Sequence, residues 1–502
     1  MWYGFVLILF LLCEFCAGFP GFRQTAADIH GFSADFTQRR HRIIVLIVMV
    51  LLIALCLEPM GWAPLWNGEV PGHRDQYEKI TQGFLKGHLY FDVEVDPALL
   101  ELENPYDRDA RSAAGVEVRQ WNDMWDHAYY NGHYYMYFGV VPVLLLFMPY
   151  QLLTGQPLTT YHATQIFAAF FIVGLFLLFA YLSKKFFPKL PLGTYLLLTS
   201  AIAVMSIWYC VAYPALYCTA IISALCLMIW SLYFFIRAVF DEEITGKTWL
   251  FATLGSLCGA LVFGCRPTIA LGNLLVIPLL ITFFHRRKLT GKQWGYTALC
   301  ALPYVAVAAG LMWYNNARFD NPFEFGQSYQ MTVADQTQYG NVLARIEWKP
   351  LFKNIKKALF RSDCAPLDYG VFVAFPILLL SVAGAVRKGS RKYLFRSGLG
   401  LVIPVSLITV VVIIAMGVLW TPYLLPRYTM DYIWLLGVAL FISVGALYQR
   451  ENVNPRLTLI VGLLSVAAIV VCIGLFLTPY DANYASHKEL NLNWVNALLK
   501  WK

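Results

Sequence analysis

A carboxylate that opens a helical pattern is the first residue whose type and position suit chemistry. After Asp75, the residues Tyr77, Ile80 and Phe84 recur on one face of the expected helix. A carboxylate in the first helical turn is stabilised as the anion by the helix dipole. Asp75 therefore suits a general base, which takes a proton from a reacting hydroxyl group. The same position also suits a helix N-cap.

Three arginines lie at the ends of apolar segments, where a positive charge needs a partner. Arg266 lies in "FGCRPT", Arg318 in "WYNNARFDNPF" and Arg427 in "PRYTMDY". A charge beside the membrane core is costly unless it is paired or reaches the lipid headgroups. A phosphate or a carboxylate is the natural partner of a guanidinium group. Asp431 follows Arg427 by one helical turn, so these two residues could also pair with each other.

The stretch "WNDMWDHAYYNGHYYMYFG" (121–139) combines acidic, histidine and aromatic residues. Such a composition suits an aromatic belt at the membrane interface. It also suits a sugar site, in which rings stack on the sugar and carboxylates bind its hydroxyl groups. His127 and His133 with Asp126 match a metal site only weakly. We predict no metal or other cofactor, with a divalent ion as the alternative. The predicted substrate-binding residues are Tyr77, Glu78, Asp123, Asp126, His127, Tyr329 and Asp431.

The elements that position these residues are those of a membrane protein. Of the 502 residues, 59% are hydrophobic and only 14% are charged, whereas a soluble chain carries roughly 25% charged residues. Apolar runs long enough to cross a ~30 Å hydrocarbon core recur along the whole chain. We expect eleven spans, at 43–57, 162–182, 192–212, 215–236, 249–265, 268–284, 295–314, 370–386, 399–418, 432–448 and 457–477. The fold class is therefore an all-α polytopic membrane protein, and the run 2–18 is a twelfth helix or an interfacial one.

The distribution of basic residues sets the expected orientation. Five basic segments fall on one side when the eleven spans alternate: "QRRHR" (38–42), "SKKFFPK" (183–189), "HRRK" (285–288), "RKGSRKYLFR" (387–396) and "YQRENVNPR" (448–456). That side is cytoplasmic. The apolar segment 135–155 must then not cross, because counting it as a span would invert everything after it.

The resulting organisation places most of the chemistry outside the cytoplasm. The expected divisions are an N-terminal helix and linker (1–41), a first span (42–57), a long extracytoplasmic loop with juxtamembrane helices (58–161), a helical bundle (162–314), a second extracytoplasmic loop (315–369), C-terminal spans (370–477) and a tail (478–502). The net charge of +8 comes from short loops and does not indicate nucleic acid. Most of the 11 cysteines lie in apolar segments and read as small hydrophobic residues.

The order of these parts resembles the GT-C superfamily of integral-membrane glycosyltransferases. In particular, it resembles the protein O-mannosyltransferases and the lipid A aminoarabinose transferases, as an uncharacterised bacterial branch. The strings that carry the resemblance are "RDQYEKITQGFLKGHLYFD", "NPYD", "WDHAYYNGHYYMYFGVVPVLL", "CRPT", "RFDNPFEFGQSYQ" and "RYTMD". The architecture is similar over about residues 40–480.

The resemblance implies a polyprenyl-phosphate-linked sugar as donor and a lipid or cell-envelope glycan as acceptor. It also implies an inverting transfer in a bacterial inner membrane, with Asp75 as the first-loop carboxylate. Gln76 stands where many members carry a Glu, and "GVVPVL" lacks the Lys that many carry. Binding of the donor phosphate is therefore assigned to Arg266, Arg318 and Arg427. A flippase or transporter of lipid-linked glycans, and a glycan polymerase or ligase, are the alternatives.

Overall fold

The computed structural model describes most of the chain. The described residues are 33–60, 75–116, 126–214, 216–332, 334–338, 348–360, 370–420, 425–449 and 455–477. The run 2–18, the tail 478–502 and Asp123 lie outside them.

Ten described helical segments are long and apolar enough to cross a membrane, so the chain is an all-α polytopic membrane protein. They consist of α3 (Arg39–Met60), α8 (Thr160–Phe186), α9 (Leu192–Ala212), α10 (Leu216–Phe240), α11 (Gly246–Leu261) with η2 (Val262–Gly264), α12 (Pro267–Ala270) with η3 (Leu271–Leu275) and α13 (Val276–Arg286), α14 (Gly291–Cys300) with α15 (Leu302–Phe319), α20 (Val402–Trp420), η7 (Pro426–Thr429) with α21 (Met430–Tyr448), and α22 (Pro455–Leu477). Ten of the eleven expected spans correspond to them.

The remaining expected span, 370–386, is broken into short pieces. They are α17 (Val371–Ala374), the 3₁₀ helix η6 (Pro376–Val382) and α18 (Ala383–Val386). Pro376 lacks an N–H group and disfavours a helical residue before it, so α17 ends there. The three pieces rise by roughly 26 Å in total, because a 3₁₀ helix rises ~2.0 Å per residue against ~1.5 Å in an α-helix. The segment therefore nearly matches the thickness of the hydrocarbon core.

Contacts with α21 hold this broken segment in place. The Ser443 hydroxyl accepts a hydrogen bond from the Gly384 N–H group and donates one to the Leu380 carbonyl, both at 2.6 Å. A Cβ atom at Gly384 would lie 2.7 Å from the Ser443 carbonyl oxygen, so only glycine permits this approach. The segment thus packs directly on α21, the most buried helix of the bundle, whose residues are all buried.

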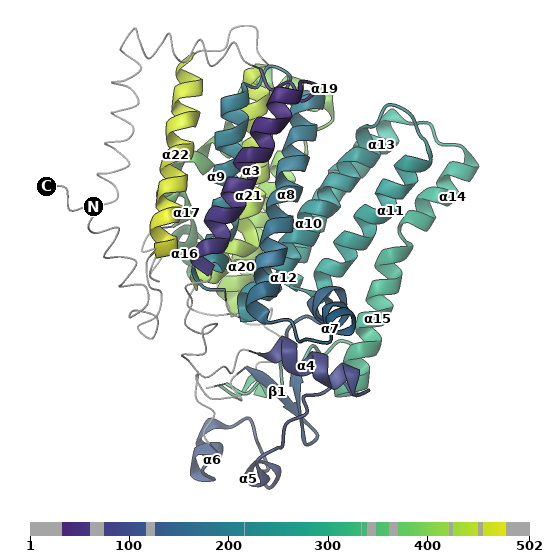
Figure 1. The fold of residues 1–502 in the computed structure, drawn as a ribbon, viewed down its shortest axis with the longest axis vertical. Coiled ribbons are helices and arrows are strands. Elements are labelled where there is room, and N and C mark those ends of the chain that lie inside the picture. The colour runs from purple at the N-terminus through teal and green to yellow at the C-terminus, as the bar shows by residue number, and fades with distance from the viewer. Residues whose placement is uncertain are drawn as a thin grey trace, which may run out of the picture.

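The helices form one bundle, and the α11, α13 and α14–α15 helices stand to one side of it (Figure 1). The core consists mainly of α8, α9, α10 and α21, whose facing side chains are buried. By contrast, only 6% of the residues in the apolar stretch of α14 and α15 are buried, so most of its apolar side chains face outward. This outward face is the composition expected of a helix in contact with lipid.

The basic segments gather at one end of the bundle, which we call the basic end. Four contacts join them: Ala34 N to Leu190 O at 2.8 Å, Lys185 Nζ to Glu242 Oε1 at 3.2 Å, Arg287 Nη1 to Glu242 O at 2.7 Å, and Arg286 Nη2 to Arg396 O at 2.8 Å. The short helix α19 (Lys388–Ser397) supplies the last of these carbonyls and lies at the same end in Figure 1.

The opposite end, which we call the site end, carries the remaining elements (Figure 1). They are α4 (Gln76–Leu85), α5 (Pro97–Leu100), α6 (Arg108–Ala113), β1 (His127–Tyr130), β2 (His133–Met136), η1 (Val143–Phe147), α7 (Met148–Thr154), η4 (Gln336–Gln338) and α16 (Trp348–Phe360). Together η1 and α7 rise only roughly 18 Å, too little to cross the hydrocarbon core. In Figure 1, α7 lies across the site end rather than along the bundle.

Candidate functional site

A hairpin at the site end fixes the position of the predicted acidic residue Asp126. Strands β1 and β2 pair antiparallel, with His127 opposite Met136 and Tyr130 opposite His133. The turn between them is Asn131-Gly132, with φ values of 47° and 78°. A two-residue Asn-Gly turn with both φ angles positive matches the twist of a hairpin. The local sequence therefore specifies the hairpin that begins directly after Asp126.

Asp126 is buried, and polar groups from distant segments bind it. Its side chain accepts hydrogen bonds from the Tyr217 hydroxyl and from Gln330 Nε2, the latter at 2.6 Å. Gln76 Nε2 donates to the Asp126 carbonyl at 3.1 Å and lies 3.2 Å from His127 Nδ1. The carboxylate is therefore held by α10 and by the segment that follows α15, and α4 holds the backbone of the same residue. Sequence reasoning missed Tyr217, Gln76 and Gln330 as partners, because nothing local to them indicates the contact.

Arg266 and Asp431 form a bidentate ion pair. Arg266 Nε lies 2.6 Å from Asp431 Oδ1, and Arg266 Nη2 lies 2.9 Å from Asp431 Oδ2. The Thr268 hydroxyl donates to Asp431 Oδ2 at 2.9 Å. Arg266 reaches this position because it precedes Pro267, the first residue of α12. The pairing of Asp431 with Arg427, which their spacing allowed as an alternative, does not form: Asp431 is occupied by Arg266, from 165 positions away.

Arg427 is the arginine of this cluster whose guanidinium group remains available. It lies over the ring of Tyr217 at 4.2 Å and near the ring of Tyr428 at 5.3 Å. Among the described residues, no hydrogen bond or ion pair occupies it. Tyr217 also binds Asp126, so this one ring joins a buried carboxylate to a guanidinium group with open donors. Such a group suits an anionic ligand.

Arg318 is used by the fold. Its Nη1 donates to the Met136 carbonyl at 2.6 Å, Nη2 to Asn315 Oδ1 at 2.9 Å, and Nε to the Tyr314 carbonyl at 3.3 Å. The side chain is 4% exposed and covers the Tyr314 ring at 3.8 Å. Arg318 therefore ties β2 to α15, and three of its five N–H donors are engaged by the fold. Its assignment to the donor phosphate stays a prediction.

Asp75 lies at the start of α4, directly before a residue that contacts Asp126. It precedes α4, and its carboxylate pairs with Lys79 Nζ at 3.0 Å. The side chain makes no hydrogen bond to the N–H groups that open the helix, so it does not cap α4. With 43% of its side chain exposed, Asp75 is an accessible carboxylate. The next residue, Gln76, contacts Asp126, which places Asp75 beside the buried polar groups.

Glu78 of α4 lies away from these residues, against the start of α8. Its carboxylate accepts hydrogen bonds from the Thr160 N–H group and from the Thr160 hydroxyl, the latter at 2.6 Å. Burial raises the pKa of Glu78 from its ordinary value of 4.5 to about 7, although these hydrogen bonds act in the opposite direction. An anion is stabilised at a helix N-terminus. Glu78 therefore joins α4 to α8.

The predicted aromatic residues lie in two different surroundings. Tyr77 is fully buried, and its ring stacks on Phe147 with centroids 5.2 Å apart. Tyr329 lies beside Tyr130 at 4.6 Å and Phe319 at 5.5 Å. Tyr77 therefore fixes α4 on η1, whereas Tyr329 belongs to an aromatic group around the hairpin. Within the described ranges, no three His, Cys, Asp or Glu side chains come together as metal ligands.

An apolar cavity adjoins the Arg266–Asp431 pair. It has a volume of about 200 Å³, and its walls include Thr268 and Tyr428 together with Ile413 and Met416 of α20. A polar pair facing an apolar chamber is the arrangement that an amphiphile with an anionic head requires. The site end thus offers an accessible carboxylate in Asp75, a guanidinium group with open donors in Arg427, and an apolar cavity beside the Arg266–Asp431 pair.

Comparisons with known proteins give little further information. No protein-family model and no curated protein matches the chain. Among solved structures, the chain is similar to the archaeal oligosaccharyltransferase AglB from Archaeoglobus fulgidus, in complex with an inhibitory peptide and a dolichol-phosphate, with a TM-score of 0.43 and 12% identity. The match covers 90% of this chain and 56% of that chain, so this chain spans about half the length of the protein it matches.

Proposed function

We propose that this protein is a membrane glycosyltransferase, which moves a sugar from a polyprenyl-phosphate donor to a hydroxyl group of a cell-envelope acceptor. The observation that supports it most strongly is Arg427. Its guanidinium group lies over Tyr217 with no hydrogen-bond partner among the described residues. A guanidinium group binds phosphate through two parallel hydrogen bonds. Arg427 is therefore assigned to the donor phosphate.

Asp75 is assigned the role of general base. Its carboxylate is accessible, with 43% of the side chain exposed, and Lys79 Nζ lies 3.0 Å from one of its oxygens. The two oxygens of Asp431 are engaged by Arg266 and Thr268. A base must reach the acceptor hydroxyl group, which favours an exposed carboxylate over a hydrogen-bonded, buried one.

The reaction balances as a single displacement. The acceptor oxygen forms a bond to the anomeric carbon, while the bond from that carbon to the phosphate oxygen breaks. The acceptor proton passes to Asp75, and the electron pair leaves with the prenyl phosphate, whose charge Arg427 stabilises. Direct displacement on one face inverts the anomeric carbon. No nucleotide is required, because the activated sugar arrives in the membrane.

The distribution of charge supports an orientation. The basic segments gather at the basic end, which faces the cytoplasm by the positive-inside rule. The site end then faces the extracytoplasmic side of a bacterial inner membrane, where lipid-linked sugars serve as donors.

Transfer assays on one pair of variants test the role of Asp75. Asp75→Asn keeps the shape and removes the proton acceptor, so we expect turnover to fall by roughly 10²–10⁴-fold. Binding of the donor should be unchanged, because the base acts on the acceptor. Asp92→Asn is the matched control, because Asp92 also pairs with a lysine, Lys86, at the surface. Near-normal turnover of Asp75→Asn in purified protein, with prenyl-phosphate sugars as donors, would remove Asp75 from the site.

A further inference from the structure

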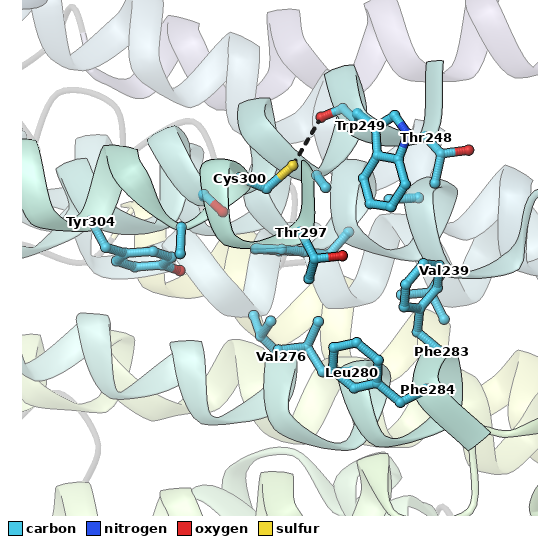
Figure 2. Close-up of a pocket in the computed structure, with 15 residues that line it drawn as sticks. Val239, Thr248, Trp249, Val276, Leu280, Phe283, Phe284, Thr297, Cys300 and Tyr304 are labelled. Carbon is cyan, nitrogen blue, oxygen red and sulfur yellow. Dashed lines mark hydrogen bonds between the residues drawn. The ribbon is translucent and has the colours of Figure 1, made fainter. Parts of the chain in front are cut away.

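Two apolar cavities lie end to end along α11 and α15. The site-end cavity, of about 340 Å³, is lined by residues that include Phe263, Pro267, Leu311 and Asn315. The basic-end cavity, of about 300 Å³, is lined by residues from α10, α11, α13 and α14. Tyr304 lines both cavities. Figure 2 shows Tyr304 at one end of the basic-end cavity and Phe283 and Phe284 at the other.

The two cavities together follow most of the membrane thickness. From Thr297 in the basic-end cavity to Asn315 in the site-end cavity, the helical rise is roughly 27 Å. An acyl chain of a bilayer phospholipid covers only one leaflet, or about half of the ~30 Å core. A single chain that filled both cavities must therefore be longer than an acyl chain, as a polyprenyl chain is.

Tyr304 is held firmly at the boundary between the cavities. Its hydroxyl group donates to Asn273 Oδ1 at 2.7 Å, and Asn273 Nδ2 donates to the Gly259 carbonyl at 3.0 Å and to the Ala270 carbonyl at 2.9 Å. A Cβ atom at Gly259 would lie 2.4 Å from both the Tyr304 hydroxyl and Asn273 Oδ1. Only glycine at position 259 therefore admits this pair of side chains.

We infer that Tyr304 sets how much of the donor's prenyl chain the protein binds. The inference rests on the proposed function. The site-end cavity begins at Pro267, directly after Arg266 of the polar cluster. A prenyl chain whose phosphate lies at this cluster enters the site-end cavity and stops at Tyr304. Further isoprene units then remain in the bilayer and add no affinity.

Removing the ring should join the cavities and extend the bound length. We would measure the affinities of farnesyl phosphate and undecaprenyl phosphate for the full-length protein in lipid nanodiscs. In Tyr304→Ala, the preference for the longer chain should rise at least tenfold over that of the wild type. Tyr304→Phe keeps the ring and should keep the wild-type preference. Tyr304→Leu also removes the ring between the two cavities. It replaces Tyr304→Ala in the measurement if the alanine variant does not fold.

Tyr296→Ala is the matched control, because Tyr296 lies on α14 but lines neither cavity. An unchanged length preference in folded Tyr304→Ala and Tyr304→Leu would overturn the inference. So would a phospholipid that stays in both cavities and is not displaced by undecaprenyl phosphate. If neither prenyl phosphate binds the wild type in a manner that depends on Arg427, the proposed function itself fails. Binding that depends on Arg427 but not on Tyr304 refutes only the length inference.

Discussion

Replacing Arg427 with alanine should weaken donor binding while leaving the fold intact. A hydrogen bond to a charged group contributes about 1.5–3 kcal/mol. Loss of one such contact to the donor phosphate therefore lowers affinity by about tenfold to 150-fold. The stability should fall by at most ~2 kcal/mol, because the change removes cation–π contacts with Tyr217 and Tyr428 and, among the described residues, no hydrogen bond. Arg427→Lys should rescue affinity poorly, because an ammonium group cannot bind a phosphate in bidentate fashion.

Arg318→Ala is the informative control for this experiment. It leaves the Met136 carbonyl and Asn315 Oδ1 without their Arg318 donor, and each buried group that loses its partner costs about 1–3 kcal/mol. We therefore expect a clear fall in melting temperature and unchanged affinity in the folded fraction. Undecaprenyl phosphate binding in nanodiscs and thermal unfolding give the two readouts. If Arg427→Ala binds prenyl phosphate as tightly as the wild type, or destabilises the protein as much as Arg318→Ala, our assignment of Arg427 is refuted.

Two further predictions concern Glu78 and the membrane topology. The raised pKa of Glu78 means that the folded state holds its proton more tightly than the unfolded state, so stability should fall as pH rises from about 4.5 through about 7. Melting temperatures at pH 5 and pH 8 should show this fall in the wild type and a smaller one in Glu78→Gln; equal slopes would contradict the assignment. Single cysteines at the exposed positions Gln156 and Lys185, in a background without the native cysteines, should be labelled from opposite sides of the membrane, because α8 separates them. Labelling from the same side would refute the expected topology.

Periodicity and charge predicted the architecture because both act over short stretches of chain. Ten of the expected spans are helical segments long enough to cross a membrane, since a run of apolar residues is sufficient to specify a helix in lipid. The break before Pro376 was missed, although its cause lies in the sequence. The site was harder to predict. The contact between Asp126 and Gln330 joins residues 204 positions apart, and no local pattern records it.

The three arginines show why local rules could not assign the phosphate site. Each lies at the end of an apolar segment, and the spacing of Arg427 and Asp431 favours an ion pair between them. In the fold, Arg266 reaches Asp431 with two hydrogen bonds, at 2.6 and 2.9 Å, and displaces that pairing. The availability of Arg427 is therefore a consequence of where α12 begins, which only the tertiary structure determines.

The competition of Arg266 and Arg427 for Asp431 leads to a prediction for Arg266. It differs from the result expected if Arg266 itself bound the phosphate. Without Arg266, Asp431 is a buried charge that lacks its partner, and Arg427 is a cation only four positions earlier in the chain. Arg266→Ala should therefore weaken prenyl phosphate binding about as much as Arg427→Ala, because Asp431 then draws Arg427 away. Adding Asp431→Asn to Arg266→Ala removes that attraction, so binding should recover. If Arg266 itself bound the phosphate, the double variant would remain as weak as Arg266→Ala alone, and the comparison of the two affinities decides between these roles.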